Sequence, residues 1–314
     1  MPRYRNGLPQ LAGTVFLTDG GLETWLVFLE RVDLPSFAAF PLVLDETGRE
    51  RLRSYFTPYL QTAGERGVGF ILDTPTWRAN ADWGDRLGYS APTLASINRQ
   101  SVALATALRD TFDDERRPVV INGVIGPRGD GYSADARMDE VDAEHYHRAQ
   151  IEAFRDTEAD MVSAVTMTYS AEAIGIARAA ESCGLPVVVS FTVELDGRLP
   201  SGETLAEAIG RMDVATGGAP AYYMVNCAHP THLGSLPVTD APWRDRVRGL
   251  RANASALSHA ELDVATELDA GNPAELGRQY RRLRSQMPQL SVLGGCCGTD
   301  HRHVTAICDA CLPS

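Results

Sequence analysis

The chain has 314 residues, of which 44% are hydrophobic and 22% are charged, and its formal net charge at pH 7 is −12. This composition is that of a globular protein, and the length permits one large α/β domain or two smaller ones. Because so acidic a surface repels phosphate backbones and anionic lipid head groups, we expect neither nucleic acid nor membranes as partners.

The sequence shows no targeting or membrane segment. No apolar run approaches the roughly 20 residues that span a bilayer. The first ten residues, Met1–Gln10, are polar and include two prolines, unlike a signal or transit peptide. We therefore expect a cytoplasmic protein. Its oligomeric state stays open, and a homo-oligomer is compatible with the sequence.

Eight short apolar runs recur along the chain, and each ends in a polar or glycine-rich turn. They are rich in Val, Ile, Phe and Leu and lack polar alternation, which is typical of strands buried on both faces. In chain order, these predicted strands are Thr14–Thr18, Gly69–Asp73, Pro118–Val124, Asp160–Thr166, Pro186–Thr192, Ala221–Asn226, Val247–Arg251 and Ser291–Gly294.

Segments with helical spacing of apolar residues lie between these runs. The clearest are Leu94–Phe112, Ala171–Cys183, Glu203–Val214 and Pro273–Arg284, the last opening with a proline suited to a first helical turn. Eight strand–helix alternations in about 300 residues predict an α/β fold, a single (β/α)8 TIM barrel.

A doubly wound sheet is the alternative fold, and it would need fewer strands and a G-x-G-x-x-G turn after the first one. Here the first predicted strand is followed by Asp19-Gly20-Gly21-Leu22-Glu23, which does not fit that pattern. No linker or shift in composition divides the chain. We therefore expect one domain that covers residues 1–314.

Three of the six cysteines follow predicted strands. Cys227 comes after the sixth strand and the pair Cys296-Cys297 after the eighth, so a barrel would bring them to the same end. Three thiolates on one face suit Zn²⁺, which takes four tetrahedral ligands. Because three protein ligands leave the fourth position open, the pattern predicts a catalytic zinc site at the C-terminal face of the strands.

The other cysteines and two nearby histidines fit structural roles. We interpret Cys183 and the pair Cys308-x-x-Cys311 as packing residues on helices. His301 and His303 fall on the predicted first turn of the last helix, and we expect them to lie outside the metal site. A dithiol redox protein that uses Cys296-Cys297 or Cys308-x-x-Cys311 remains an alternative.

Aromatic side chains and one histidine mark the predicted mouth of the barrel. Trp77, Trp83 and Tyr132 follow strands two and three, where their rings could hold a cationic ligand or pack in the core. His229 lies two residues after Cys227 and is a candidate substrate contact.

Six segments together resemble the homocysteine S-methyltransferase family, which includes S-methylmethionine- and betaine-dependent enzymes and the homocysteine domain of cobalamin-dependent methionine synthase. The resemblance runs from about residue 14 to residue 305, and the terminal cysteine motif combined with Asn-Cys is its most specific part. The segments are Asp19-Gly20-Gly21, Ile125-Gly126-Pro127, Val189–Thr192, Asn226-Cys227, Asn253-Ala254 and Gly294–Thr299.

The resemblance implies a zinc-dependent methyltransferase in which Cys227, Cys296 and Cys297 hold the metal and activate the thiol of the acceptor. The acceptor would most simply be homocysteine, which gives methionine. If the chain acts alone, the donor would be a small onium compound of the S-methylmethionine, S-adenosylmethionine or betaine type, because the chain has no room for cobalamin or folate domains. A separate corrinoid protein is the alternative donor. The expected substrate contacts are Asp19, Gly20, Gly21, Thr24, Trp77, Asn226, Asn253, His229 and Glu194.

Two positions depart from the family pattern, and both replace a polar group with an apolar one. The usual Glu-Thr pair after the fourth strand, whose carboxylate helps to hold the substrate ammonium, is Val165-Thr166 here. The usual serine of the third-strand motif is Val124. Glu194 could compensate for the missing carboxylate. The alternatives are therefore the same chemistry on another small thiol or selenol, and a non-catalytic, zinc-stabilised barrel that binds a small molecule.

Overall fold

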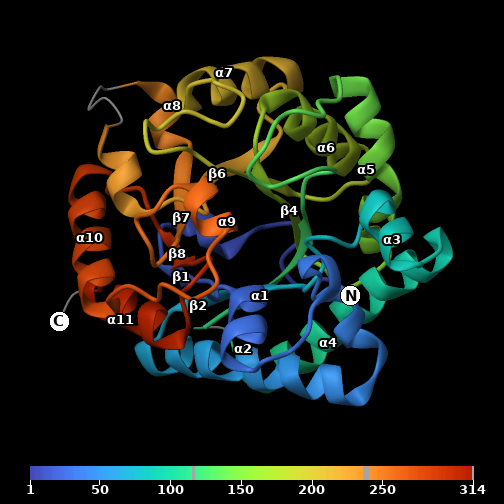
Figure 1. Ribbon diagram of the computed structural model, residues 1–314, viewed down its shortest axis with the longest axis horizontal. Helices are drawn as coiled ribbons and strands as arrows, with labels where there is room; N and C mark the ends of the chain where they lie inside the picture. The colour runs from blue at the N-terminus through green and yellow to red at the C-terminus, as the bar shows by residue number, and fades with distance from the viewer. Residues whose placement is uncertain (115–116, 236–240, 313–314) are drawn as a thin grey trace.

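The computed structural model describes residues 1–114, 117–235 and 241–312. Eight parallel strands form a closed barrel in sequential order, with β8 paired to β1 (Figure 1). The predicted (β/α)8 barrel is therefore confirmed, and all eight predicted strands are found. Their bounds are β1 Phe16–Leu17, β2 Gly69–Asp73, β3 Val119–Ile125, β4 Met161–Met167, β5 Val187–Phe191, β6 Pro220–Asn226, β7 Val247–Ala252 and β8 Val292–Gly295.

Helices connect the strands and form the outer ring in Figure 1. The four predicted helices correspond to α4, α6, α7 and α10. In the described part of the chain, no helix combines the length and apolar character needed to cross a membrane. The helices are α1 Leu22–Thr24, α2 Glu46–Arg66, α3 Ala81–Leu87, α4 Ala91–Phe112, α5 Glu140–Arg155, α6 Ser170–Ser182, α7 Leu205–Thr216, α8 Pro242–Asp245, α9 His259–Asp263, α10 Pro273–Gln286 and α11 His301–Cys311.

Local capping signals set the ends of the longer helices. Ser90 accepts a hydrogen bond from the backbone N–H of Thr93 and so begins α4, and Thr204 and Glu207 form a capping box that begins α7. Helix α2 ends at Gly67, whose φ of 65° is a left-handed conformation that glycine adopts without strain. These capping hydrogen bonds are local, so they set the helix ends without partners on the barrel strands.

The barrel interior is apolar at the N-terminal ends of the strands. Almost every strand contributes one inward-facing side chain to this layer, and Leu8 of the N-terminal segment adds to it from below. Packing of this kind fills a small barrel and leaves the opposite end for function. The layer consists of Leu8, Phe16, Ile71, Val120, Met161, Val188, Tyr222, Met224 and Val292.

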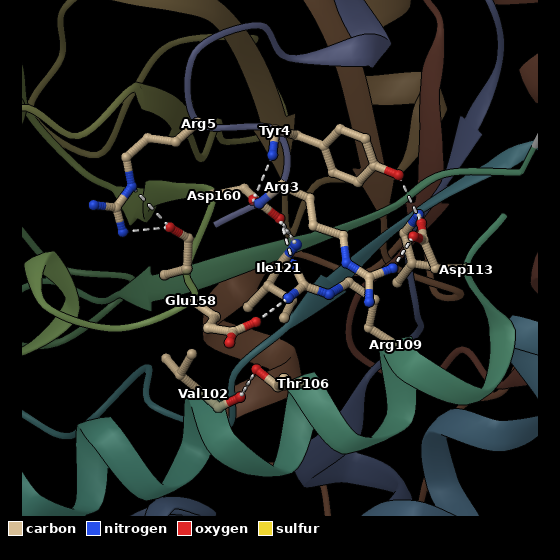
Figure 2. A network of polar contacts seen from close by, with 12 residues as sticks. Arg3, Tyr4, Arg5, Val102, Thr106, Arg109, Asp113, Ile121, Glu158 and Asp160 are labelled. Atoms are coloured by element: carbon tan, nitrogen blue, oxygen red, sulfur yellow. Dashed lines mark hydrogen bonds and ion pairs between the residues drawn. The ribbon is translucent and has the colours of Figure 1, made fainter. Parts of the chain in front are cut away.

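The N-terminal segment is bound to the base of the barrel through Asp160, the buried residue before β4 (Figure 2). The backbone N–H groups of Arg3 and Tyr4 both donate to Asp160 Oδ1 at 2.8 Å. Arg109 of α4 donates to Asp160 Oδ2 at 3.2 Å and to Glu158 at 2.5 Å. The polar start of the chain is therefore a structural element of the barrel base.

The fully buried Arg109 guanidinium makes this network sensitive to substitution. We expect Arg109→Met to lower the free energy of unfolding by about 3–5 kcal/mol, because it leaves the Asp160 carboxylate buried without its cation. Urea unfolding followed by circular dichroism would measure the loss. Arg99→Met, an exposed position on the same helix, is the control, and equal midpoints for the two variants would contradict the expectation.

Candidate metal centre

The three predicted ligand cysteines converge at the C-terminal end of the barrel. Their Sγ atoms all lie within 4.8 Å of one another. Strand β7 lies between the two strands that carry the cysteines, and its backbone positions both. The backbone N–H of Cys227 donates to the carbonyl of Arg251 at 3.1 Å, and that of Cys296 donates to the carbonyl of Ala252 at 2.8 Å.

The spacing and chemistry of this three-cysteine centre fit a zinc ion. Sulfur ligands about 2.3 Å from a tetrahedral zinc lie roughly 3.8 Å apart, so the observed 4.8 Å limit requires only small side-chain rotations. Hydrogen bonds from Cys227 and Cys297 lower the pKa of the Cys296 thiol well below its usual range. Hydrogen bonding to Cys296 raises the pKa of the Cys227 thiol, and hydrogen bonding to Cys227 and Cys296 raises the pKa of the Cys297 thiol. A bound cation would be needed to hold all three as thiolates.

The glycine turn after β1 packs directly against the cysteine pair. A Cβ atom at Gly21 would lie 2.5 Å from the carbonyl oxygen of Cys296, closer than real Cβ contacts. The next turn of chain completes the contact, because Thr24 Oγ1 accepts the backbone N–H of Gly298 at 3.1 Å. The Asp-Gly-Gly segment therefore sets the path of the backbone that carries Cys296 and Cys297.

Asn226 joins the ends of β4, β5 and β6 beside Cys227. Its Oδ1 accepts from the backbone N–H of Thr166 at 2.9 Å and from Ser190 Oγ at 2.6 Å, and its Nδ2 donates to Thr166 Oγ1 at 2.8 Å. Thr166 and Cys227 both have positive φ, of 64° and 53°. Such strained conformations persist where surrounding bonds enforce them, and they concentrate at functional sites.

A cavity of about 430 Å³ opens beside the three cysteines. Its wall is apolar on the β3 and β4 side, where Val124 and Val165 line it. Tyr132 also lines it, and the Tyr132 hydroxyl lies 3.6 Å from Cys297 Sγ. Among the predicted substrate contacts, those that line this cavity are Asp19, Gly20, Gly21, Thr24, Trp77 and Asn226.

Arg251 forms the charged floor of the cavity. Its guanidinium donates to Asp19 at 2.5 Å and to Asp73, and its Nε donates to the carbonyl of Gly295 at 3.3 Å. Burial, opposed by Arg251, raises the pKa of Asp19 to about 7. Tyr55 also donates to Asp19, at 3.1 Å. Both carboxylates at the floor therefore already have partners.

Besides Asp19, Asp73 and Arg251, the charged lining side chains that are not exposed are Glu23 and Arg78, whereas the lining residues Asp130, Asp263, Glu267 and Asp269 are exposed. Among the residues that the structure describes, none gives the Glu23 carboxylate an ion pair or a side-chain hydrogen bond. Arg78 donates to the carbonyl of Ser36 at 2.7 Å, and its guanidinium lies 3.8 Å above the Trp83 ring. Trp83 is thus a support for Arg78, and it is absent from the cavity lining.

Three predicted substrate contacts lie outside the cavity, which corrects their expected placement. The Asn253 side chain donates to the carbonyl of Cys227 at 3.1 Å, so it faces the backbone of the cysteine turn. His229 bonds with Thr231 at 2.7 Å in its own turn, and burial lowers its pKa to about 4. Glu194 lies 3.1 Å from His259 Nδ1. Each of these three side chains points from its loop toward the partner named above and away from the cavity.

Glu194 instead supports Tyr132 of the cavity wall through His259. The His259 ring stacks on the Tyr132 ring with centroids 4.2 Å apart, and its Nε2 lies 2.6 Å from the carbonyl of Cys227. The Glu194 carboxylate faces Nδ1 and the Cys227 carbonyl faces Nε2, so the ring is held between the two. Glu194 therefore does not replace the carboxylate that is missing at Val165.

Four charged cavity-lining residues that are not exposed were not predicted from the sequence. Asp73 and Arg251 end buried strands, and a charged residue at the end of an otherwise apolar strand was the available signal. Glu23 is the lone acidic residue of the apolar segment 22–29, and Arg78 directly follows Trp77. The sequence alone could not show which of these charges have partners.

The remaining cysteines and histidines lie where the helical interpretation put them. Cys308 is buried on α11, and burial raises its pKa to about 12, which keeps the thiol protonated and unreactive. His303 caps α11, accepting the backbone N–H of Asp300 at 3.1 Å. These positions give no support to a redox role for Cys308-x-x-Cys311.

Comparisons with known proteins agree with this architecture. Residues 16–311 match the family model described as homocysteine S-methyltransferase. The chain is similar in structure to the homocysteine methyltransferase MmuM from Escherichia coli in its oxidized form, with a TM-score of 0.73, 18% identity, and coverage of 97% of this chain and 99% of that chain. A comparison with curated protein sequences finds no match.

Two further forms of the same enzyme are also similar in structure. The metallated form gives a TM-score of 0.72 at 18% identity and covers 96% of this chain and 99% of that chain. The apo form gives a TM-score of 0.61 at 18% identity and covers 95% and 96%. At this level of identity the likeness shows a shared fold.

The contact between Gly21 and Cys296 predicts how the centre responds to a single methyl group. We expect Gly21→Ala to push the Cys296 carbonyl away and to weaken Zn²⁺ retention by at least about tenfold, as changes around metal ligands do. Chelator competition would measure it. Gly129→Ala adds a methyl group in open space in a loop at the same end of the barrel and is the control. A Gly21→Ala protein with unchanged retention would refute the prediction.

Proposed function

Because the chain belongs to the homocysteine S-methyltransferase family, it is a methyltransferase, and we propose that it moves a methyl group from a small onium donor to a thiol at the three-cysteine centre. The observation that carries this proposal is the convergence of Cys227, Cys296 and Cys297, with sulfur atoms within 4.8 Å of one another, beside a cavity of about 430 Å³. We further propose Zn²⁺ as the resident metal. That the E. coli enzyme is known in a metallated form supports a metal here.

Zinc bound by the three cysteines would supply a positive centre that favours the thiolate form of an acceptor sulfur. The thiol proton leaves to solvent. The thiolate attacks the methyl carbon in line with the bond to the donor atom, a new S–C bond forms, and the departing sulfur or nitrogen keeps the electron pair and becomes neutral. Because this reaction cancels charge, the apolar wall of Val124 and Val165 favours it.

The charges of the cavity favour a cationic donor. Carboxylates outnumber guanidinium groups among the lining residues, and those at the exposed rim attract positively charged molecules. The Trp77 ring on the cavity wall offers a face for cation–π contact. A donor of the S-methylmethionine, S-adenosylmethionine or betaine type fits this environment. The lining carboxylates are Asp19, Glu23, Asp73, Asp130, Asp263, Glu267 and Asp269, against Arg78 and Arg251.

Homocysteine is the simplest acceptor, and its use would give methionine. Because Val165 has no charge, β4 offers no carboxylate at this position to bind the amino group of the acceptor. Another small thiol or selenol therefore remains the rival acceptor. A panel of thiols assayed with one onium donor separates the two, since turnover of another thiol without turnover of homocysteine would favour the rival.

Metal analysis combined with a serine variant tests the proposed centre. We expect the purified protein to hold one zinc per chain, and Cys297→Ser to lose the metal and more than about 100-fold of the methyl-transfer rate, since even changes beyond the ligands cost about 10- to 100-fold. The far-ultraviolet circular dichroism should stay unchanged.

The control is Cys183→Ser, a partly buried cysteine outside the cavity. A zinc-free active enzyme, or a Cys297→Ser protein with full metal and rate, would contradict the assignment. Unfolding of the barrel on removal of the metal would point instead to a structural zinc.

A further inference from the structure

Among the charged cavity-lining side chains that are not exposed, one carboxylate and one guanidinium make no ion pair in the part of the chain that the structure describes. Asp19 and Asp73 both pair with Arg251, whereas Glu23 has no side-chain partner among the residues the structure describes. Arg78 is the only other guanidinium in the lining of the described cavity, and a single backbone carbonyl accepts from it. Free charges of opposite sign in one cavity are the complement of a zwitterion.

Their position relative to the three-cysteine centre is favourable. Gly21 packs against the carbonyl of Cys296, and Glu23 is two residues further along the chain. The charge of Cys296 contributes to raising the pKa of Glu23, after the larger effect of burial, and Arg78 opposes both. The result is a pKa of about 7 for Glu23. Glu23, Arg78, Cys296 and Cys297 all line the same cavity, and no ion pair joins Glu23 to Arg78 among the described residues.

Arg78 is held in place by aromatic rings. Its guanidinium lies 3.8 Å from the centroid of Trp83 and 4.9 Å from that of Trp77. Stacking of this kind fixes the plane of a guanidinium and leaves its edge for a carboxylate. The Arg78 Nε atom is buried and has no hydrogen-bond partner, so the hydrogen-bonding capacity of the side chain is not exhausted by the protein.

We propose that Glu23 and Arg78 bind the α-amino-acid end of the thiol acceptor, with the Glu23 carboxylate taking the ammonium group and the Arg78 guanidinium taking the carboxylate. This assignment rests on the proposed function and narrows it to an amino-acid thiol. It also accounts for Val165, because the carboxylate for the ammonium comes from the β1 side of the cavity and none is needed from β4. The Glu23→Gln and Arg78→Gln variants each remove one of the two charges.

Three thiols serve as probes in the test: L-homocysteine, 4-sulfanylbutanoate, which lacks the amino group, and 3-aminopropane-1-thiol, which lacks the carboxylate. Zinc-loaded protein is titrated with each thiol in a calorimeter without donor, and kcat/KM is then measured with an onium donor. We expect the wild type to prefer homocysteine over each analogue by about 10- to 100-fold, the value of one charge-assisted contact.

Each variant should lose only the preference that its own charge creates. In Glu23→Gln the ratio of homocysteine to 4-sulfanylbutanoate falls to near one, while the ratio to 3-aminopropane-1-thiol persists. Arg78→Gln shows the reverse pattern. The controls are Glu30→Gln, which is exposed on the same segment, and Arg86→Gln, whose guanidinium lies 4.6 Å from the same Trp83 ring outside the cavity. Both should keep the wild-type ratios.

The outcomes separate this inference from the function on which it rests. If the wild type methylates homocysteine and its analogues equally, or if Glu23→Gln keeps the wild-type ratios, Glu23 and Arg78 do not bind the acceptor while the methyl-transfer proposal stands. If zinc-loaded wild type neither binds nor methylates any of the three thiols, both proposals fail. Unchanged zinc content and melting temperature in the variants exclude a general loss of structure as the cause of a changed ratio.

Discussion

The buried Arg251 guanidinium is the interaction on which the organisation of the catalytic end depends. One side chain from β7 binds carboxylates that follow β1 and β2 and a carbonyl at the end of β8, so it joins four strands across the point where the barrel closes. A charge buried this deeply is stable only with its partners in place. Asp19 and Asp73 are thereby paired with a cation, whereas Glu23 and Arg78, the other charged lining side chains that are not exposed, make no ion pair among the described residues.

The architecture separates stability from chemistry along the barrel axis. The apolar layer and the Asp160 network fix the lower half, whereas the upper half contains the strained Thr166 and Cys227 backbones and a group of cysteines that repel one another as thiolates. Asn226 and the Gly21 turn offset this strain locally. The backbone strain of Thr166 and Cys227 is therefore confined to the site, and the lower half of the barrel keeps unstrained packing.

Much of the fold and the sulfur cluster could be predicted from the sequence. Buried parallel strands have a strong apolar signal, and a closed barrel places all their C-terminal ends on one face. Cys227 and the Cys296-Cys297 pair follow from that geometry alone. The rest depends on side-chain direction within loops, which has no simple periodicity. The Asn253 side chain bonds to the Cys227 carbonyl and Glu194 to His259, so neither lines the cavity, whereas Glu23 of α1 does.

The seam between β1 and β8 has a consequence for biosynthesis. Cys227 leaves the ribosome about 70 residues before Cys296, and the strand that carries the cysteine pair is the one that completes the ring. Of the three cysteines of the centre, a nascent chain therefore presents only Cys227 until the last strand supplies Cys296 and Cys297. A polypeptide that lacks β8 lacks two of the three sulfur atoms of the centre, so the proposed metal site would require the closed ring.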